Sequence, residues 1–505
     1  MSSGIAFAIP YCTLQLEQGL AAATVLNIEF LLSGGKLYRK FQKVPSMTGK
    51  NIGFVSTRFA GIDGVSLEAR KWSEVLEQNG HQCFWFAGEL DRNPETSFLE
   101  PKAHFQYPRN RWINSQIFGK KRRKHITTES IHTLRSFLKT RLYNFLHRFR
   151  IDILIVENAL TIPLNIPLGI ALSEIIAETE IPTIAHHHDF YWERERFSIN
   201  GVSDYLRMAF PPNLPGIQHV VINSEAQEQV ALRLGISSTV IPNVLDFDHP
   251  PVVNEHKVFS FRKSLGLNHD DKIILQPTRI IRRKGIEQAI ELVKGLKDPR
   301  YKLVISHEAG DEGFEYAHWL KDYALERGVD LRMLAAQISD PWNGNGHFKP
   351  AFTLWDIYPC ADLITYPSIR EGFGNALIEA VYFKKPILVN RYATFIRDIE
   401  PKGFELLVMN GFLTQETVSR AKEIIESQKV REKMVNTNYE VAARHYSYAV
   451  LRNRLNTILK GFSFSPDRHL SDKTSDSHHV IYLNRSVHTV QHDEQMYSVK
   501  MEASD

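Results

Sequence analysis

The sequence contains little cysteine, little net charge and no internal repeat. Its three cysteines, Cys12, Cys83 and Cys360, are far apart, which excludes a disulfide framework and a Cys-x-x-Cys metal site. The 61 basic and 57 acidic side chains give a net charge of +4, so overall charge offers no argument for nucleic-acid binding. These absences are typical of a soluble globular protein of a reducing compartment, and we expect a cytoplasmic one.

The N-terminal segment 4–32 is moderately apolar and basic residues follow it, so a membrane anchor has to be considered. Glu17 and Glu29 lie inside this segment, and no basic residue precedes it. A membrane-spanning helix contains few or no charged residues, and a signal sequence begins with basic ones. Both features of this segment therefore argue against a membrane anchor. We therefore interpret residues 1–47 as an N-terminal extension of a globular protein.

After the extension, apolar strands alternate with amphipathic helices, which predicts an α/β fold with parallel sheets. A chain of 505 residues is long enough for two ordinary domains. His249-Pro250-Pro251 reads as the linker between them, and the Ser-, Asp- and His-rich end reads as a disordered tail. The predicted divisions are 48–248 and 249–440 for the domains, 441–462 for a C-terminal helix and 463–505 for the tail.

The stretch Arg370–Ala380 reads Arg-Glu-Gly-Phe-Gly-Asn-Ala-Leu-Ile-Glu-Ala and lies between a predicted strand and a predicted helix. Gly372 and Gly374 would let the backbone approach a ligand, and the start of the helix would face an anion. We expect Asn375 to cap that helix. The stretch therefore predicts a ligand-binding loop.

Two carboxylates, Glu371 and Glu379, stand in this loop and helix with seven residues between them. Each carboxylate can accept two hydroxyl hydrogen bonds, which suits a polyol ligand. The alternative is a surface loop whose acids are solvated or favour the helix dipole.

A basic pair, Arg279 and Lys284, follows the predicted strand 272–276. Two fixed cations at the carboxyl end of a strand and near a helix start suit a diphosphate. A basic turn alone would more often be solvated. Its occurrence in one domain with the two acids favours a binding site.

Three consecutive histidines, His186–His188, end the predicted strand from Pro182 and precede Asp189. They invite a metal interpretation, but neighbouring strand residues point to opposite faces and cannot all reach one ion. No Glu or His at helical ligand spacing joins them. The Asp-x-Asp at Asp246–Asp248 lies in the segment between the domains, where we expect it to be solvated. We therefore expect no bound metal.

A basic run at Lys120–Lys124 precedes a predicted helix over 130–150 that is basic on one side. The region Lys120–Arg150 could contact an anionic membrane surface weakly or recruit an acidic acceptor. A core-packing helix with a solvated basic face is the commoner outcome, and we favour it.

The two acids with Gly-Phe-Gly between them resemble the Glu-x7-Glu signature of the family-four retaining glycosyltransferases. Other motifs of that family occur in the family's order over roughly residues 50–461. They are Arg279 and Lys284 for Arg-x4-Lys, His188-Asp189 for the His-Asp pair, and Ile241-Pro242-Asn243 for the boundary motif. The chain departs from the pattern at three places: Asp63-Gly64 replaces Gly-Gly, Val244 replaces glycine, and His307-Glu308 replaces a Gly-rich turn.

The resemblance implies the GT-B fold, in which two doubly wound Rossmann-like domains face a cleft. It also implies a role for each matched residue. Glu371 and His188 would lie beside the donor sugar, with His187 as a competitor for the histidine's role. Arg279, Lys284 and Gly64 would meet the phosphates and Glu379 the ribose. Beside the donor would lie Phe373, Gly374, Asn375 and Ala376, and on the acceptor side Asp189, Trp192 and Arg194.

The implied reaction is transfer of a hexose from a nucleotide-diphosphate sugar to a hydroxyl group, with retention at the anomeric carbon and without metal or cofactor. His188, Arg279, Lys284 and Glu371 would be catalytic. The charged and aromatic stretch 191–197 suggests a small polar acceptor, namely a sugar, a sugar phosphate or a glycerate-type acid. We expect the loop 338–350 to lie near the nucleobase. The alternatives are a nucleotide-sugar epimerase or hydrolase on the same fold and a non-catalytic nucleotide-sugar-binding protein.

Overall fold

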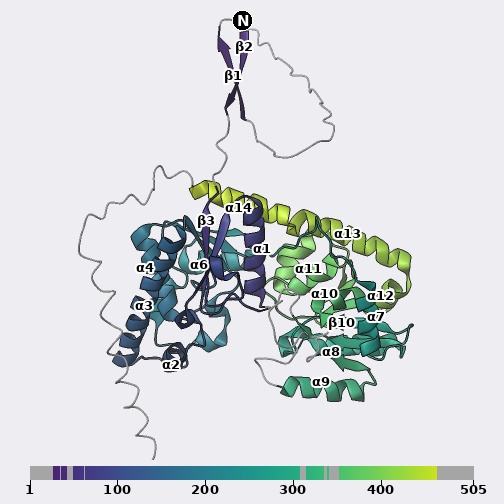
Figure 1. The fold of residues 1–505 in the computed structure, drawn as a ribbon. Coiled ribbons are helices and arrows are strands. Elements are labelled where there is room, and N and C mark those ends of the chain that lie inside the picture. Colours follow the sequence, from purple (N-terminus) through teal and green to yellow (C-terminus); the bar gives the residue numbers. More distant parts are fainter. Residues whose placement is uncertain are drawn as a thin grey trace, which may run out of the picture. The chain divides into compact units, whose positions relative to one another are not determined.

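The computed structural model describes residues 27–33, 36–42, 49–61, 63–307, 314–334, 338–339 and 352–462 (Figure 1). The described residues up to 452 belong to one compact unit, and residues 453–462 belong to a second. The predicted tail, and residues 340–350 of the loop expected to meet the base, lie outside the described residues. Within the N-terminal extension, β1 (Asn27–Ser33) and β2 (Lys36–Gln42) form an antiparallel hairpin that we did not predict.

A parallel seven-stranded sheet forms the first half of the larger unit. Its middle strands are continuous apolar segments buried on both faces, as parallel strands require. In spatial order the strands are β5 (Ser97–Leu99), β4 (Gln82–Ala87), β3 (Asn51–Val55), β6 (Ile153–Glu157), β7 (Thr183–His187), β8 (Ile217–Val221) and β9 (Ser238–Val240).

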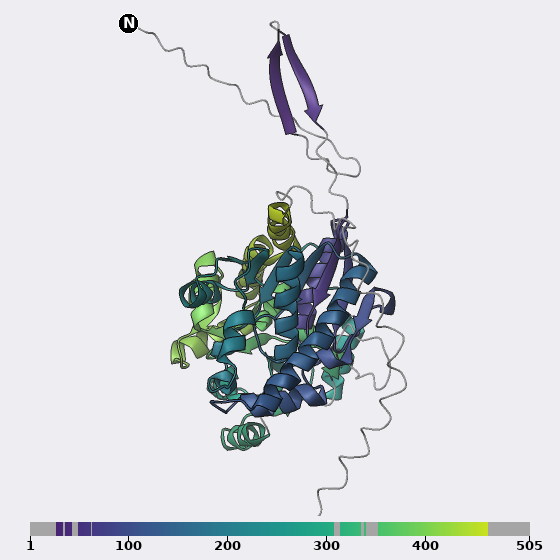
Figure 2. The same cartoon turned by 90° about the vertical axis from the view of Figure 1, so that its left-hand side faces the viewer.

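Helices cover this sheet, and α3 with α4 packs on one face of it (Figure 2). The helices of this half are α1 (Gly64–Gln78), α2 (Pro108–Ile117), α3 (His125–Phe149), α4 (Ile166–Thr179), α5 (Ser203–Ala209) and α6 (Ser224–Leu234). The apolar stripe of α3, from Ile131 to Phe149, is buried in the core, which confirms the core-packing interpretation. Two of its basic residues, Arg135 and Lys139, pair with glutamates of α4. The weak membrane contact of this region stays a prediction.

A parallel six-stranded sheet forms the second half. Its spatial order is β12 (Leu331–Met333), β11 (Tyr301–Ile305), β10 (Lys272–Gln276), β15 (Leu363–Tyr366), β16 (Ile387–Asn390) and β17 (Leu407–Met409). Its helices are α7 (Glu255–Ser264), α8 (Ile286–Leu296), α9 (Glu315–Glu326), α10 (Leu354–Ile357), α11 (Asn375–Tyr382), α12 (Gln415–Glu426) and α13 (Gln428–Tyr446). The predicted loop 338–350 begins with a short strand, β13 (Ile338–Ser339), which pairs with β14 (Phe352–Thr353).

The two sheets confirm the predicted pair of doubly wound domains. In each sheet the strand order reverses at one place, between β3 and β6 in the first and between β10 and β15 in the second. Ligands of such sheets bind outside the carboxyl ends of the strands at this switch point. The fold therefore directs attention to the loops that follow these four strands.

The last helix, α14 (Tyr448–Phe462), begins next to α1. The Tyr448 hydroxyl donates to a Glu74 carboxylate oxygen at 2.7 Å, and the Arg452 guanidinium donates to the Gln78 side-chain oxygen at 2.8 Å. In the part of the chain that the structure describes, no helix combines the length and hydrophobicity needed to cross a bilayer.

Candidate active site

Glu371, in the loop after β15, is paired with Lys284, which ends a 3₁₀ turn after β10. Both side chains are about nine-tenths buried, and the Arg283 guanidinium lies 3.2 Å from the other Glu371 oxygen. Burial opposes ionisation of Glu371, but Lys284 and Arg283 hold its pKa below the ordinary value. Burial also lowers the pKa of Lys284, and Glu371 counteracts this effect. From the sequence we expected Lys284 to bind the phosphates and Glu371 to bind the sugar. The structure joins these two side chains in one ion pair.

Arg279 lies on the exposed side of the same turn. Burial lowers the pKa of His307 to about 4, and the charges of Lys284 and Arg279 add to this effect. The Arg279 charge also lowers the pKa of Lys284. The charges of the predicted basic pair therefore act on each other, and Lys284 is the member that contacts Glu371.

Gly285, directly after Lys284, is required by the packing of this turn. Its φ of +60° is in the left-handed region, and a Cβ there would lie 2.6 Å from the Pro367 carbonyl oxygen. Only glycine meets both conditions without strain. It lets the turn that carries Lys284 pack against the loop that carries Glu371.

The start of α11 differs from our prediction. Gly374 is the N-cap residue, with φ +118°, and Asn375 is the first residue of the helix. The left-handed conformation of Gly374 makes the sharp turn into the helix, a conformation that asparagine adopts at greater cost. Asn375 instead accepts a hydrogen bond from the Asn243 amide at 2.6 Å.

Glu379 lies in the second turn of α11, within the helix as predicted, and it is partly buried. It accepts a hydrogen bond from the Tyr358 hydroxyl at 2.7 Å. Burial raises its pKa, although that hydrogen bond acts in the opposite direction. The two acids of the Glu-x7-Glu pattern therefore occupy different environments: one is held in an ion pair, and the other is hydrogen-bonded to a phenol.

The residues predicted from the first half of the chain lie against this loop. The Asn223 amide donates to the Gly372 carbonyl at 2.5 Å. A Cβ on Gly372 would lie 3.6 Å from the His188 carbonyl oxygen, and one on Gly64 would lie 3.9 Å from the Asn375 amide nitrogen. A small cavity here is lined by Lys71, Asn243, Val244, Leu245, Phe373, Asn375, Ile378 and Glu379. The structure thus brings Gly64 and His188 together with the Glu371–Asn375 loop.

The three consecutive histidines divide between the two faces of β7. His187 is fully buried and contacts the Thr161 hydroxyl and, at 2.9 Å, the His219 ring. His186 and His188 lie on the opposite face, where both meet Glu157. Because His187 is enclosed on the far face, the geometry favours His188 for the role beside the donor sugar.

Glu157 was missed in the sequence. It is the last residue of β6, directly opposite His186 in the strand register. The ligand atoms of Glu157, His186 and His188 lie within 4.8 Å of one another, a spacing that would also suit a metal ion. The His186 Nδ1 and the His188 Nε2 nevertheless each lie 2.9 to 3.1 Å from Glu157 carboxylate oxygens, so hydrogen bonds account for the arrangement. A glutamate at the end of an otherwise apolar strand was the signal that could have revealed it.

The predicted acceptor-side residues, Asp189, Trp192 and Arg194, lie in the turns after β7, where hydrogen bonds and ion pairs hold their side chains. The Arg194 guanidinium pairs with the Asp189 carboxylate. The Trp192 ring nitrogen donates to the Gln229 side-chain oxygen at 2.7 Å. The neighbouring Glu193 is 3.3 Å from the Arg370 guanidinium, so this segment also contacts the loop that contains Glu371.

The Asp-x-Asp segment does not form a metal clamp in the structure. Asp246 is partly buried and accepts from the His249 ring at 2.9 Å, whereas Asp248 is exposed and Phe247, between them, is buried. The two carboxylates therefore lie in different surroundings. The expectation of a solvated segment therefore holds for Asp248 and only in part for Asp246, and the absence of a bound metal stays a prediction.

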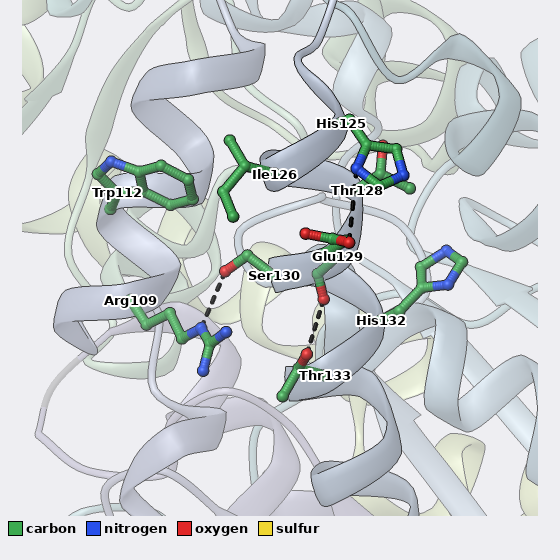
Figure 3. A pocket seen from close by; sticks show the side chains of 9 residues that line it. All are labelled: Arg109, Trp112, His125, Ile126, Thr128, Glu129, Ser130, His132 and Thr133. Carbon is green, nitrogen blue, oxygen red and sulfur yellow. Dashed lines mark hydrogen bonds and ion pairs between the residues drawn. The ribbon is translucent and has the colours of Figure 1, made fainter. Parts of the chain in front are cut away.

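A larger hollow lies between α2 and α3, with a volume of about 880 Å³ (Figure 3). Its polar groups contact other side chains of the chain: the Arg109 Nε donates to the Ser130 hydroxyl at 2.9 Å, and the His132 ring lies 2.7 Å from the Tyr205 hydroxyl. None of the residues predicted for donor or acceptor lines it. We therefore place the functional site at the switch points and not in this hollow.

The fold and the clustered motif residues define a class, the GT-B glycosyltransferases, and the family comparisons agree. Residues 62–249 match the model of Glycosyltransferase Family 4, and residues 258–441 match that of Glycosyl transferases group 1. The chain belongs to this family and is a glycosyltransferase. Its relatives include the mannosylglucosylglycerate synthases of Petrotoga mobilis (34% identity, covering 71% of this chain and 86% of that protein) and Thermotoga maritima (32%, 80% and 98%).

Solved structures confirm the fold. The Anabaena protein HepE, solved with UDP and glucose, matches with a TM-score of 0.57 at 13% identity over 82% of this chain and all of that one. A sucrose-phosphate synthase from Thermosynechococcus elongatus matches with a TM-score of 0.54 at 14% identity over 82% of this chain and 99% of that one.

Proposed function

We propose that this enzyme transfers a hexose from a nucleotide-diphosphate sugar to a hydroxyl of a small glycerate-type acceptor. One observation carries the donor part: Lys284 and Arg279 follow β10, their charges act on each other, and Lys284 pairs with Glu371 in the loop that leads into α11. Cations and helix N–H groups placed in this way stabilise the charge of a departing diphosphate. Glu371 would orient the sugar through its hydroxyls, and Glu379 would hold the ribose.

The acceptor part rests on the relatives. The two named above are mannosylglucosylglycerate synthases, and a Petrotoga protein with 26% identity over 59% of this chain is a mannosylglucosyl-3-phosphoglycerate synthase. A mannose donor with a glucosylglycerate or a glucosyl-3-phosphoglycerate acceptor is therefore the first combination to try. The higher identity of the first two relatives favours the acceptor without phosphate.

We propose further that transfer proceeds with retention and without a metal ion. Positioning by the loops of both sheets would hold the acceptor hydroxyl on the face from which the diphosphate departs. A phosphate oxygen of the leaving group could take the acceptor's proton. The basic side chains and the helix terminus would supply the charge stabilisation that a divalent cation provides in other enzymes.

The test is release of nucleotide diphosphate by the full chain from UDP-, GDP- and ADP-sugars, with and without each acceptor. We expect release from one donor only when glucosylglycerate is present, and loss of release in Glu371→Gln. The anomeric configuration of the product, read by NMR against that of the donor, decides retention. Donor consumption without any acceptor would instead indicate a hydrolase or epimerase, and donor binding without consumption would indicate a non-catalytic protein.

A further inference from the structure

Glu157 is a fully buried acid that no sequence motif assigns. Its side chain has no solvent exposure. A buried carboxylate is costly unless it is paired and hydrogen-bonded. Here the His186 Nδ1 lies 3.0 Å from one oxygen and 3.1 Å from the other, and the His188 Nε2 lies 2.9 Å from the first. One carboxylate therefore holds two imidazole rings.

The pKa shifts of the two histidines in this cluster have opposite directions. Burial alone would raise the pKa of Glu157, but the two histidines lower it to about 2. Burial lowers the pKa of His186, whose ring stacks on Trp72 at 4.2 Å. The pKa of His188 is raised, because the hydrogen bond and charge of Glu157 outweigh burial. The cluster thus contains an ionised carboxylate, a His186 whose pKa is lowered and a His188 whose pKa is raised.

Other charged groups face the cluster from neighbouring elements. Glu68 of α1 acts on both His186 and His188, and Lys71 on the same helix neutralises it at 2.6 Å. Asp189, next to His188 in the chain, is paired with Arg194. Since both of these carboxylates have their own cations, Glu157 is the acid whose hydrogen bonds act directly on the His188 ring.

His188 is fixed at its backbone as well as at its ring. Its backbone N–H donates to the Asn158 side-chain oxygen at 2.9 Å, and the Asn158 amide donates to Asp189 at 3.3 Å. Asn158 adopts a left-handed φ of +56°, which asparagine tolerates better than most residues. Two consecutive residues, Glu157 at the end of β6 and Asn158 directly after it, therefore set the place of His188. The contact with Glu157 uses the ring's Nε2, which leaves Nδ1 for a ligand.

We propose that Glu157 is a positioning residue for glycosyl transfer, which fixes the His188 ring and keeps it an imidazolium whose Nδ1–H donates a hydrogen bond to a donor-sugar hydroxyl. This inference rests on the proposed function, in which His188 lies beside the sugar. An isolated imidazolium would oppose the positive charge that develops on the sugar ring. Glu157 cancels that charge, so the pair offers a strong hydrogen-bond donor without net charge.

The test compares Glu157→Gln with the wild-type chain. Glutamine has nearly the same shape and still accepts a hydrogen bond, but it lacks the charge. Glu100→Gln is the matched control, because Glu100 is also buried in the first half of the chain and pairs with Arg141 at 2.8 Å, away from the histidines. Two quantities are measured for each protein: the imidazole NMR titration of His188, assigned with His188→Gln, and the pH profile of turnover.

We expect wild-type His188 to titrate above the ordinary value of 6.5 and turnover to fall as pH rises through that titration. In Glu157→Gln the titration and the fall should both move at least about one pH unit lower, with turnover about tenfold lower at pH 8. The KM for the donor should change much less than kcat. Glu100→Gln should lose stability but keep the wild-type titration and profile.

A wild-type His188 that titrates below 6.5 would overturn the proposal, even if Glu157→Gln does not fold. So would an unchanged titration and profile in a folded Glu157→Gln. One equivalent of zinc bound by the wild type and lost in the variant would replace the proposal with a metal site. If the wild type transfers no sugar at all, the proposed function fails, and the NMR titration still shows whether Glu157 controls His188.

Discussion

Glu157 and Glu371 occupy equivalent places in the two sheets. Glu157 ends β6 in the first sheet and Glu371 lies in the loop after β15 in the second, and the strand order reverses at both strands. Glu371 pairs with Lys284 and Arg283, whose ordinary pKa values lie far above neutrality. Glu157 pairs with two histidines, whose ordinary pKa lies near neutrality. A buried glutamate thus pairs with strongly basic side chains in one half and with titratable histidines in the other.

This difference fits the groups that each edge would meet. A diphosphate keeps its negative charge throughout the working range of pH, so a fixed cluster of cations suits it. A sugar hydroxyl is neutral and needs a directed donor without net charge, which a carboxylate–imidazolium pair supplies. The type of residue that pairs with the buried glutamate therefore determines which sheet edge carries a charge that changes with pH.

The largest effect is expected for Glu371→Gln. Removing the charge leaves Lys284 buried without its counter-ion and removes the carboxylate that orients the sugar, so turnover should fall about 10²–10³-fold. The NMR titration of His188 should keep its wild-type midpoint in this variant, because the pairing of His188 with Glu157 is untouched. Glu291→Gln, a surface change in α8, is the control. A His188 titration that moves to lower pH, as predicted for Glu157→Gln, would remove the contrast between the two edges.

A moderate effect is expected for Gly374→Ala. The φ of +118° strains any other residue, and the new Cβ would lie 2.3 Å from the Tyr392 hydroxyl oxygen. The free energy of unfolding should fall by about 3 kcal/mol, and the KM for the donor should rise.

The matched change is Gly80→Ala in the first half, at φ +85° with no atom within 4 Å of the added Cβ. Only the backbone strain applies there, so the cost should be about 1 kcal/mol and the KM should not change. Urea unfolding of both variants measures the difference. Equal destabilisation would mean that Tyr392 moves aside and that the loop before α11 is not tightly fixed.

The smallest effect is expected from metal removal. In the proposed mechanism the side chains of each edge supply the positive charge, so prolonged EDTA treatment should leave turnover unchanged. The measurement is diphosphate release before and after chelation, with added manganese or magnesium as the reference. Complete loss that either ion restores would contradict metal independence and would make the Glu157 cluster the first place to look for the ion.

Much of the fold could be predicted from the sequence because the strands are short, mostly apolar and regularly spaced. The positions of Lys284 and Glu371 followed from a motif that lies next to such strands. The start of α11 was predicted wrongly, because the left-handed turn at Gly374 depends on the packing of Tyr392 and not on the capping preference of Asn375.

Two kinds of feature could not be predicted. Helix α2 was missed because only three of its ten residues, Asn110, Ile113 and Ile117, are buried, which leaves little apolar periodicity. Glu157 was missed because it is 31 residues from His188 and reaches it only through the pairing of β6 with β7. Which residues of two strands lie side by side depends on the order of the strands in the sheet, and the local sequence does not specify this order.

The burial of the triple histidine has a practical consequence for purification. In sequence, His186–His188 looks like half of an affinity tag. In the folded protein His186 and His187 are each only 1% exposed, and the side chain of His188 is 10% exposed and hydrogen-bonded through its ring. These rings cannot coordinate nickel on a resin without unfolding. The run therefore cannot serve as a purification tag in the folded protein, and a tag has to be added elsewhere.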